Sequence, residues 1–309
     1  MISWLFIAIS SYLIFSVTAL VDKYLLSSRI PNPKILCFYI ACLSLSVVFL
    51  IPFPFAGFEI PSFFQIILAL FAGATFIFWL FLLYRVLRVF EASRVFPTIG
   101  ALSALMIFLS IYIFSEGREV LDTASFVAFV LLVLGGFLIN YRKNIQISSK
   151  VLLSCLAPAL ILSLYFILSK YVYLNQPFLS GFIWTRIGSF LAGMIIFLLF
   201  LKEIKGELSR QNKKSSSENK KTAVVFLANQ TAGAAGVILS SWAIALAPLA
   251  SVSIVNALQG IQYAFMFIFA IFISWKFPKI LKEDISKEII FQKIIAIILI
   301  AVGLAILAS

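Results

Sequence analysis

The sequence lacks histidine altogether, and it holds only three cysteines and 12 acidic residues in 309 positions. The absence of histidine removes the commonest metal ligand and the commonest general base. Cys37, Cys42 and Cys155 are an odd number and lie scattered in apolar runs, which argues against a disulfide framework and against a metal site. No acid pair lies at the core of an apolar run and no GxSxG-type elbow occurs, so the sequence predicts neither an enzyme nor a bound cofactor.

Apolar side chains are what the sequence has in abundance. They make up 63% of the chain, charged residues make up 12%, and the mean hydropathy is +1.12. A helix that crosses a hydrocarbon core about 30 Å thick needs about 20 residues. Runs of about that length predict an all-α membrane protein with ten transmembrane helices, at residues 3–21, 35–55, 62–84, 95–114, 123–141, 151–173, 178–201, 222–246, 249–274 and 289–308.

Lys and Arg gather in every second connection between these runs. The five odd-numbered connections hold 21 of the 24 cations, whereas the even-numbered connections hold only Arg118 and Lys170. Because cytoplasmic loops retain Lys and Arg, the odd connections are expected in the cytoplasm and both termini outside, in a multi-pass protein of the cytoplasmic membrane. The net charge of +12 is therefore attributed to loops beside anionic lipid headgroups and not to nucleic-acid binding.

Five of the expected helices precede residue 146 and five follow it. An odd number in each half makes equivalent helices run in opposite directions, which is the arrangement called an inverted repeat. Short matches at equivalent positions support two repeats, 1–145 and 146–309, because Lys23-Tyr24 recurs as Lys170-Tyr171. The longest connection, 202–221, is rich in serine and in charges of both signs, which predicts a flexible cytoplasmic loop.

The connections between the third and fourth helices and between the eighth and ninth share a short motif. The first reads Glu91-Ala92-Ser93-Arg94 ahead of Pro97, and the second contains Ala250-Ser251. With this motif, a lysine at the end of the first helix and ten helices in two inverted fives, the chain resembles the EamA family of the drug/metabolite transporter superfamily. The resemblance covers essentially the whole chain. It implies secondary transport of small organic solutes through a cavity between the halves, and it implies no particular substrate or direction.

Polar side chains at bilayer depth are costly and mark candidate functional sites. The richest cluster lies on the expected helix 249–274, where Asn256, Gln259 and Tyr263 stand at i, i+3 and i+7 on one face, with Gln262 beside them. Their amides offer donors and acceptors, which suits zwitterionic or hydroxylated solutes. The alternative is that these side chains bond neighbouring helices to one another.

Arg186 is the only cation well inside an expected helix, and it follows Trp184. A guanidinium at that depth can clamp a carboxylate or a phosphate through two parallel hydrogen bonds. The alternative is a structural role, in which the side chain satisfies helix-end carbonyls or reaches the outer headgroups. The remaining candidates for substrate contact are polar residues of three other expected helices: Asn229, Gln230, Tyr165 and Thr98.

The predicted function is a secondary transporter that moves a small organic metabolite, amino-acid-like and neutral or anionic, by alternating access. Cations are not expected as substrates, because no acid lies at the core of an expected helix unless Asp22 reaches inward. The alternatives are a carrier of a lipid-linked substrate, marked by an opening between helices toward the bilayer, and a non-transporting scaffold, marked by an apolar seam without a cavity. The expected partners are the solute and the bilayer, and the sequence specifies neither a coupling ion nor an oligomeric state.

Overall fold

The computed structural model of the chain describes residues 3–25, 32–50, 57–90, 92–138, 149–203, 206, 216–276 and 287–308. These residues are almost entirely helical, and no strand occurs among them. The first half holds α1 (Ser3–Tyr24), α2 (Pro33–Ser44), the 3-10 helix η2 (Leu45–Leu50), α3 (Phe63–Val89), α4 (Ala92–Phe114) and α5 (Thr123–Leu138). The second half holds α6 (Ser149–Asn175), α7 (Phe178–Leu199), α9 (Ser216–Leu246), α10 (Val252–Ala257), α11 (Gln259–Lys276) and α12 (Lys287–Ala308).

Seven of the described helices are long and apolar enough to cross a membrane: α1, α3, α4, α6, α7, α9 and α12. Their backbone amides and carbonyls bond within each helix, which a lipid environment requires. Apolar side chains also cover much of the outer surface, as the half-exposed or exposed Phe64, Leu153 and Val224 show. The expectation of an all-α, multi-pass membrane protein is therefore confirmed.

Two expected helices are shorter than a full span. α2 has 12 residues, and its chain continues as the six-residue η2. It starts where Asn32 caps it, since the Asn32 side chain accepts a hydrogen bond from the Lys34 amide and Pro33 occupies the first turn. α5 has 16 residues. α9, in contrast, begins six residues earlier than expected, so residues 216–221 of the expected loop 202–221 are helical.

The expected helix 249–274 is divided into α10 and α11 at Leu258. Leu258 keeps a right-handed backbone, but the amide of Ile261 bonds the Leu258 carbonyl, three residues back, so the helix tightens there. Just after this break, a Cβ on Gly260 would lie 3.2 Å from the Cα of Gly136 on α5. The break and the missing side chain together let α11 cross α5 closely.

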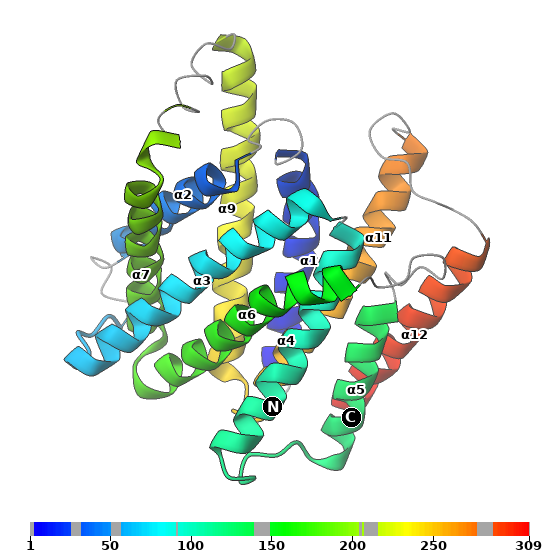
Figure 1. Cartoon of the computed structure of the whole chain (residues 1–309). Helices are drawn as coiled ribbons and strands as arrows, with labels where there is room; N and C mark the ends of the chain where they lie inside the picture. Colours follow the sequence, from blue (N-terminus) through cyan, green and yellow to red (C-terminus); the bar gives the residue numbers. More distant parts are fainter. Residues whose placement is uncertain are drawn as a thin grey trace.

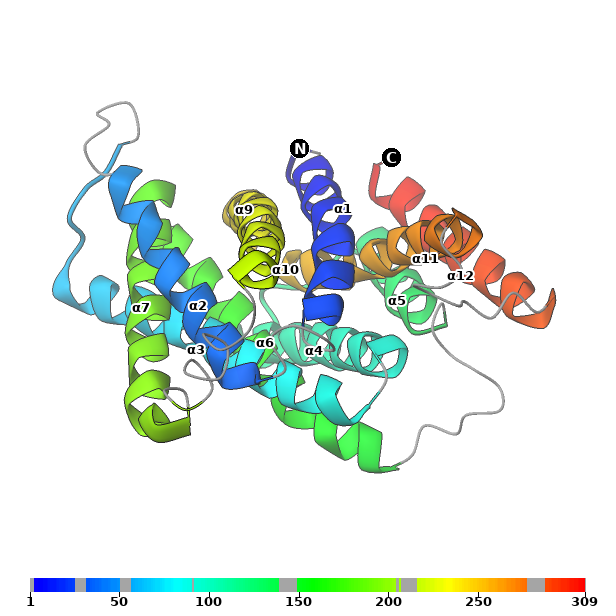
Figure 2. The same ribbon diagram turned by 90° about the horizontal axis from the view of Figure 1, so that it is seen from above.

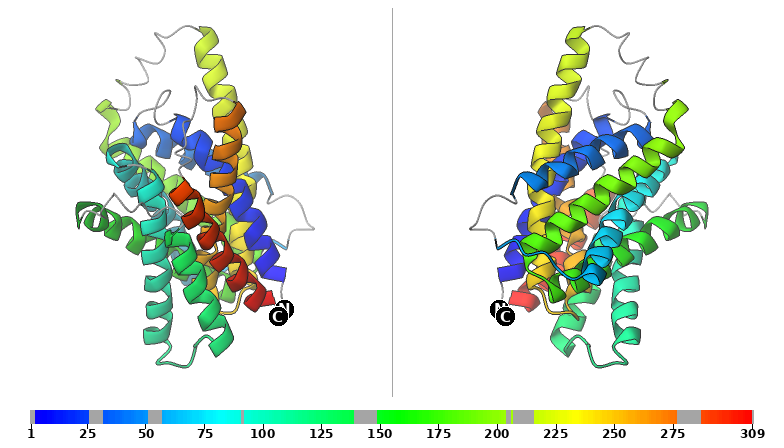
Figure 3. Two further views of the ribbon diagram at one scale, coloured as in Figure 1. Left: turned by 90° about the vertical axis from the view of Figure 1, so that its right-hand side faces the viewer. Right: turned by 90° about the vertical axis from the view of Figure 1, so that its left-hand side faces the viewer.

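The molecule has two distinguishable ends. Both chain ends lie at one of them, here called the terminal side (Figures 1 and 3). α1 and α11 end, and α9 begins, at the opposite end, called the basic side because many of the Lys and Arg residues follow α1 and α11 or precede α9 in the sequence. The connection between α4 and α5, which carries Arg118, lies on the terminal side.

Seen along this axis, the helices form two lateral groups with a central pair between them (Figure 2). α2, α3 and α7 pack together in one group, and α5, α11 and α12 pack together in the other. α1 and α9 pack side by side in the centre, while α4 and α6 cross the molecule next to them. The arrangement brings helices from both halves of the chain around one interior space.

Glycines set the closeness of α3 and α7. A Cβ on Gly73 would lie 1.8 Å from the carbonyl oxygen of Thr185, and a Cβ on Gly188 would lie 2.1 Å from that of Leu70. The Ser189 hydroxyl donates to the Gly73 carbonyl at 3.0 Å across the same contact. Small residues that let backbones meet are the usual basis of helix association in membranes. This pair of helices therefore packs backbone against backbone.

Candidate functional site

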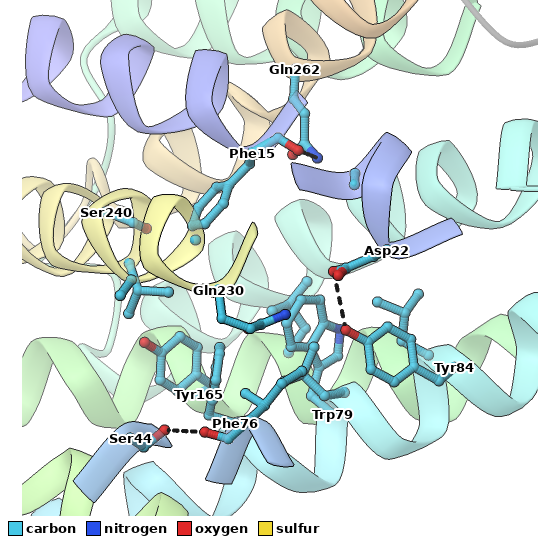
Figure 4. Close-up of a pocket in the computed structure, with 18 of the residues that line it drawn as sticks. Phe15, Asp22, Ser44, Phe76, Trp79, Tyr84, Tyr165, Gln230, Ser240 and Gln262 are labelled. Carbon is cyan, nitrogen blue, oxygen red and sulfur yellow. Dashed lines mark hydrogen bonds between the residues drawn. The ribbon is translucent and has the colours of Figure 1, made fainter. Parts of the chain in front are cut away.

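A cavity of about 730 Å³ lies between α1, α2, α3, α4, α6, α7, α9 and α11 (Figure 4). It reaches the basic ends of α1 and α3 at Asp22 and Phe90, and it stops short of the terminal ends of α6, α7 and α9. Most of its wall is aromatic or aliphatic, with a small number of polar side chains. Six of the ten residues that the sequence suggests for substrate contact line it: Tyr165, Arg186, Gln230, Gln259, Gln262 and Tyr263.

Arg186 is the buried cation of this wall, with 4% of its surface exposed. Its guanidinium carbon lies 4.6 Å from the centre of the Phe76 ring and 5.4 Å from that of Phe182, within the range of cation–π attraction. One terminal nitrogen donates to the Tyr165 hydroxyl at 3.4 Å, which is a long bond. Its Nε has no hydrogen-bond partner among the described residues. Arg186 therefore keeps unused donor capacity in an aromatic cage.

Trp79 adds a second unused donor to the same wall. Its ring centre lies 5.8 Å from that of Phe76, and its indole nitrogen is buried with no partner among the described residues. A buried N–H without an acceptor costs about 1–3 kcal/mol. Trp79 and Arg186 both stand beside Phe76 on the cavity wall. The sequence leaves Trp79 between membrane anchoring and packing, because hydropathy does not show which side chains face a cavity.

Three polar side chains at the start of α11 face the cavity. The Tyr263 hydroxyl donates to the carbonyl of Phe96 at 2.6 Å and lies 3.4 Å from the Gln259 side-chain oxygen. The Gln262 amide donates to the Phe15 carbonyl at 3.3 Å. These bonds join α11 to α4 and to α1, so these side chains both connect helices and line the wall. The two interpretations of this cluster are thus compatible.

Asn256 is separated from that cluster. It lies on α10, before the break at Leu258, and it is fully buried outside the cavity wall. The Ser103 hydroxyl donates to its side-chain oxygen at 2.9 Å, which ties α10 to α4. The expected single face through Asn256, Gln259 and Tyr263 does not form, because the helix is not continuous there.

Three further candidates also lie outside the wall. Trp184 stands two positions before Arg186 and packs with Leu68 and Val172 between α3 and α6. Residues two apart on a helix point in different directions, so the two side chains separate. Thr98 on α4 and Asn229 on α9 are buried but do not line the cavity.

Asp22 is the functional candidate that sequence reasoning leaves open, and it does line the cavity. One carboxylate oxygen accepts a hydrogen bond from the Asn229 amide at 2.7 Å. The other accepts from the Tyr84 hydroxyl at 3.2 Å, shown as a dashed line in Figure 4. Its sequence signal is an acid in the last turn of an apolar helix. The direction of the side chain depends on how α1 packs against α3 and α9.

The terminal side of the cavity is closed by polar bonds between helices. The Lys170 ammonium, almost fully buried, donates to the carbonyls of Ala245 at 3.0 Å and Ala247 at 2.5 Å. These carbonyls belong to the end of α9, where a cation satisfies helix-end acceptors. Further bonds join the start of α3 to the end of α6, from Gln65 to the Asn175 carbonyl.

Replacing Lys170 with methionine should lower the thermal stability of the protein purified in detergent. The substitution keeps most of the apolar volume but leaves two buried carbonyls without a donor, which should cost about 1.5–3 kcal/mol. Thermal unfolding measures the loss. The matched control is Lys202→Met, because Lys202 is exposed at the basic side, and it should unfold as the unmodified protein does. Equal stability of the two variants would contradict the capping role.

Comparison with known proteins gives the fold more support than the function. No protein-family model and no curated protein matches the chain. Twenty-six chains of solved structures match it. One of them, described as "Crystal structure of protein", has 16% sequence identity and a TM-score of 0.62, over 98% of this chain and 96% of its own. At that identity the likeness shows a shared fold alone, and it extends over the whole chain.

Proposed function

We propose that the protein is a secondary transporter of small organic solutes, and that it holds an anionic group of the solute at Arg186. The observation that carries the proposal is the cage around Arg186, where the Arg186 and Trp79 side chains line a cavity and each has an N–H donor without a partner in the described part of the chain. A guanidinium binds carboxylate or phosphate through charge-assisted hydrogen bonds. A carboxylate offers two acceptor oxygens for such donors.

The rest of the wall supports a small, amino-acid-like or otherwise amphipathic metabolite. The cavity of about 730 Å³ falls in the range of small-molecule sites, which are mostly apolar with a few placed polar groups. Phe76, Phe166 and Phe182 offer surface for an apolar body. The Gln259 and Gln262 amides offer donors and acceptors to its neutral polar groups. The substrate class that fits these features is a neutral or anionic solute, with the acidic end at Arg186.

We further propose that ten membrane spans form two inverted halves, 1–145 and 146–309, as in the EamA family. Helix pairs that exchange under such a symmetry do pack alike, because α1 packs on α9 as α6 packs on α3. One pair breaks the match, since α3 packs extensively on α7 while α2 and α9 share much less contact. In a carrier that is open to one side of the membrane and closed to the other, the two inverted halves are expected to pack differently. The basic side, toward which the cavity extends, would face the cytoplasm, with both termini outside.

Filling the cavity tests the proposal without assuming which residues bind. A Cβ on Gly233 meets no atom within 4 Å, and Gly233 lines the cavity, so Gly233→Trp should place an indole in the space without a clash at its root. Saturable uptake into proteoliposomes should fall about tenfold or more, because the indole occupies the space that a solute needs. The solutes offered are amino acids, sugars, organic anions and organic cations. The matched control is Val224→Trp on the lipid-facing surface of the same helix, where 66% of the side chain is exposed.

The same panel decides among the competing functions. Saturable flux that Val224→Trp keeps and Gly233→Trp loses would support a carrier with its path through this cavity. Flux retained by Gly233→Trp would remove the cavity from the path. Absence of flux from folded, inserted protein would favour a scaffold. The cavity argues against a scaffold, because a scaffold is expected to fill the space between its helices with apolar side chains.

A lipid-linked substrate is the second candidate, and one observation favours it. Leu43 from α2, Val47 from the following η2, and Val237 and Ile238 from α9 line the cavity, although α2 and α9 share little contact. An apolar chain could lie between them while its phosphate occupied Arg186. Adding a prenyl monophosphate to the panel distinguishes the cases. A lipid carrier would bind it, and none of the water-soluble solutes would displace it.

A further inference from the structure

The carboxyl group of Asp22 stands apart from the substrate cage described above. Arg186 lies over Phe76, and Asp22 bonds to Tyr84, eight residues farther along α3. Eight residues of α-helix advance about 12 Å. Arg186 and Asp22 therefore contact α3 at points about two turns apart, at different parts of the same cavity wall.

The partners of Asp22 suit a proton better than a metal cation. Asn229 turns its NH₂ group toward the carboxylate, at 2.7 Å, and the same nitrogen lies 3.5 Å from the Thr18 carbonyl. Alkali and alkaline-earth cations are bound by oxygen ligands, and an N–H donor directed into the site opposes them. The Tyr84 hydroxyl can donate to a charged carboxylate and can accept from a protonated one. Both protonation states of Asp22 thus keep two hydrogen bonds.

The position of Asp22 gives its charge a mechanical effect. Its carboxylate joins three helices at the basic end of the cavity: α1, which carries it, α9 through Asn229 and α3 through Tyr84. α1 and α9 already pack along their length, whereas α3 belongs to the lateral group with α7. The Tyr84 bond is therefore a link between these two units. It lies at the side toward which the cavity extends.

We propose that Asp22 is a proton-binding site of this protein, separate from the anion site at Arg186, and that proton binding there changes the link between α3 and the α1–α9 pair. The proton adds to the carboxylate oxygen that faces Tyr84, and the Tyr84 hydroxyl turns from donor to acceptor. The charge-assisted bond is replaced by a weaker neutral one. Binding and release of one proton then loosens and tightens the basic end of the cavity. Coupling of this step to solute movement rests on the proposed transport function, whereas proton binding itself does not.

The other titratable and charged side chains near Asp22 come from two helices. Tyr84 and Arg88 face the cavity from α3, and Cys37 faces Asp22 from α2. The neighbours from α9 and α11, Asn229 and Gln262, carry no titratable group. Tyrosine and cysteine ordinarily titrate near 10 and about 8.5, and arginine stays charged, so among these described side chains Asp22 is the group that changes charge in mildly acidic solution.

Infrared spectra of the purified protein test proton binding without any solute. Acidifying the protein from about pH 8 to about pH 4 should produce the carbonyl band of a protonated carboxyl, since buried carboxyl groups titrate over a wide range. Asp22→Asn should lose one component of this band. Tyr84→Phe should keep that component and shift it, because the hydrogen-bond partner of the acid is gone.

Asp122→Asn is the matched control. Asp122 lies exposed between α4 and α5, where hydrogen bonds from the Ser125 side chain and from the Ser125 and Ala124 amides hold its pKa below the ordinary value. The contribution of Asp122 to the carbonyl band should appear only at the acidic end of the titration. Tyr84→Phe should leave it unchanged. A spectrum of Asp22→Asn that is identical to that of the unmodified protein, or a component insensitive to Tyr84→Phe, would overturn the proposal.

Transport in proteoliposomes tests the coupling. With the solute that the uptake panel identifies, Asp22→Asn should retain equilibrium exchange and should lose accumulation driven by a pH gradient about tenfold or more. A sodium gradient should drive no accumulation, and accumulation driven by sodium alone would overturn the assignment to a proton. If no solute is carried at all, the proposed function fails, while the infrared result still decides proton binding at Asp22.

Discussion

Replacing Arg186 with glutamine should raise the half-saturating concentration of an anionic solute about 30-fold or more, while the protein stays folded. Removing one member of a buried, hydrogen-bonded charge pair costs about 2–5 kcal/mol, and about 1.4 kcal/mol corresponds to a factor of ten. Without solute, Arg186 is a buried cation held by aromatic rings and one long hydrogen bond. An uncompensated buried charge is itself destabilising, so thermal stability should be equal or higher in the variant.

The expected pattern is a loss of binding with a gain or no change in stability, which a merely structural arginine would not give. Initial uptake rates over a range of solute concentrations and thermal unfolding of the same preparation measure the two quantities. Arg118→Gln is the matched control, since Arg118 is exposed on the terminal side and pairs only with its neighbour Glu116 among the described residues. Trp79→Phe should give a smaller loss, about tenfold, because it removes one N–H donor and keeps an aromatic ring. A lower unfolding midpoint of Arg186→Gln, together with an unchanged half-saturating concentration of the solute, would contradict the anion site.

A single methyl group at Gly73 or Gly188 should destabilise the protein by about 3 kcal/mol or more. Overpacking a well-packed interior costs about 1–3 kcal/mol when side chains can move aside, and occasionally more. Here the obstacles are backbone atoms, the carbonyl oxygens of Thr185 and Leu70, at 1.8 and 2.1 Å from the new Cβ. The two helices would have to move apart, which also breaks the bond from Ser189 to the Gly73 carbonyl.

Thermal unfolding of Gly73→Ala, Gly188→Ala and Gly233→Ala in one detergent gives the comparison. Gly233 has open space at its Cβ position, so alanine there meets no atom within 4 Å and gains about 1 kcal/mol of helix propensity. The three substitutions are chemically identical and all lie within long helices. Similar midpoints for all three would show that the contact between α3 and α7 does not limit stability.

The sequence predicts the helices well where one apolar run corresponds to one helix. The expected run 151–173 lies within α6 and the run 178–201 nearly coincides with α7, because length and hydropathy alone decide those elements. The division at Leu258 was not predictable in the same way. No proline stands there, and apolar residues lie on both sides of the boundary. The division falls where Gly260 meets Gly136 of α5, a contact between residues more than a hundred positions apart.

The candidate site divides along the same line. The sequence shows Gln259, Gln262 and Arg186 as polar residues inside apolar runs, and all three side chains line one cavity. Trp184 could have been set aside from the sequence, since two residues of helix separate it from Arg186 by about 200°. Asp22 and Trp79 could not have been added, because their directions depend on the packing of α1 and α3 against other helices.

α9 has a practical consequence through its length. Its 31 residues span about 46 Å, which exceeds a hydrocarbon core of about 30 Å, and Figure 3 shows its first turns standing clear of the other helices. A protein of 34.4 kDa with little mass outside the bilayer offers few features by which images of single particles can be aligned. A soluble helical domain fused in phase with the start of α9 would continue the same helix. The orientation of that domain would then report the tilt of the central pair in every particle.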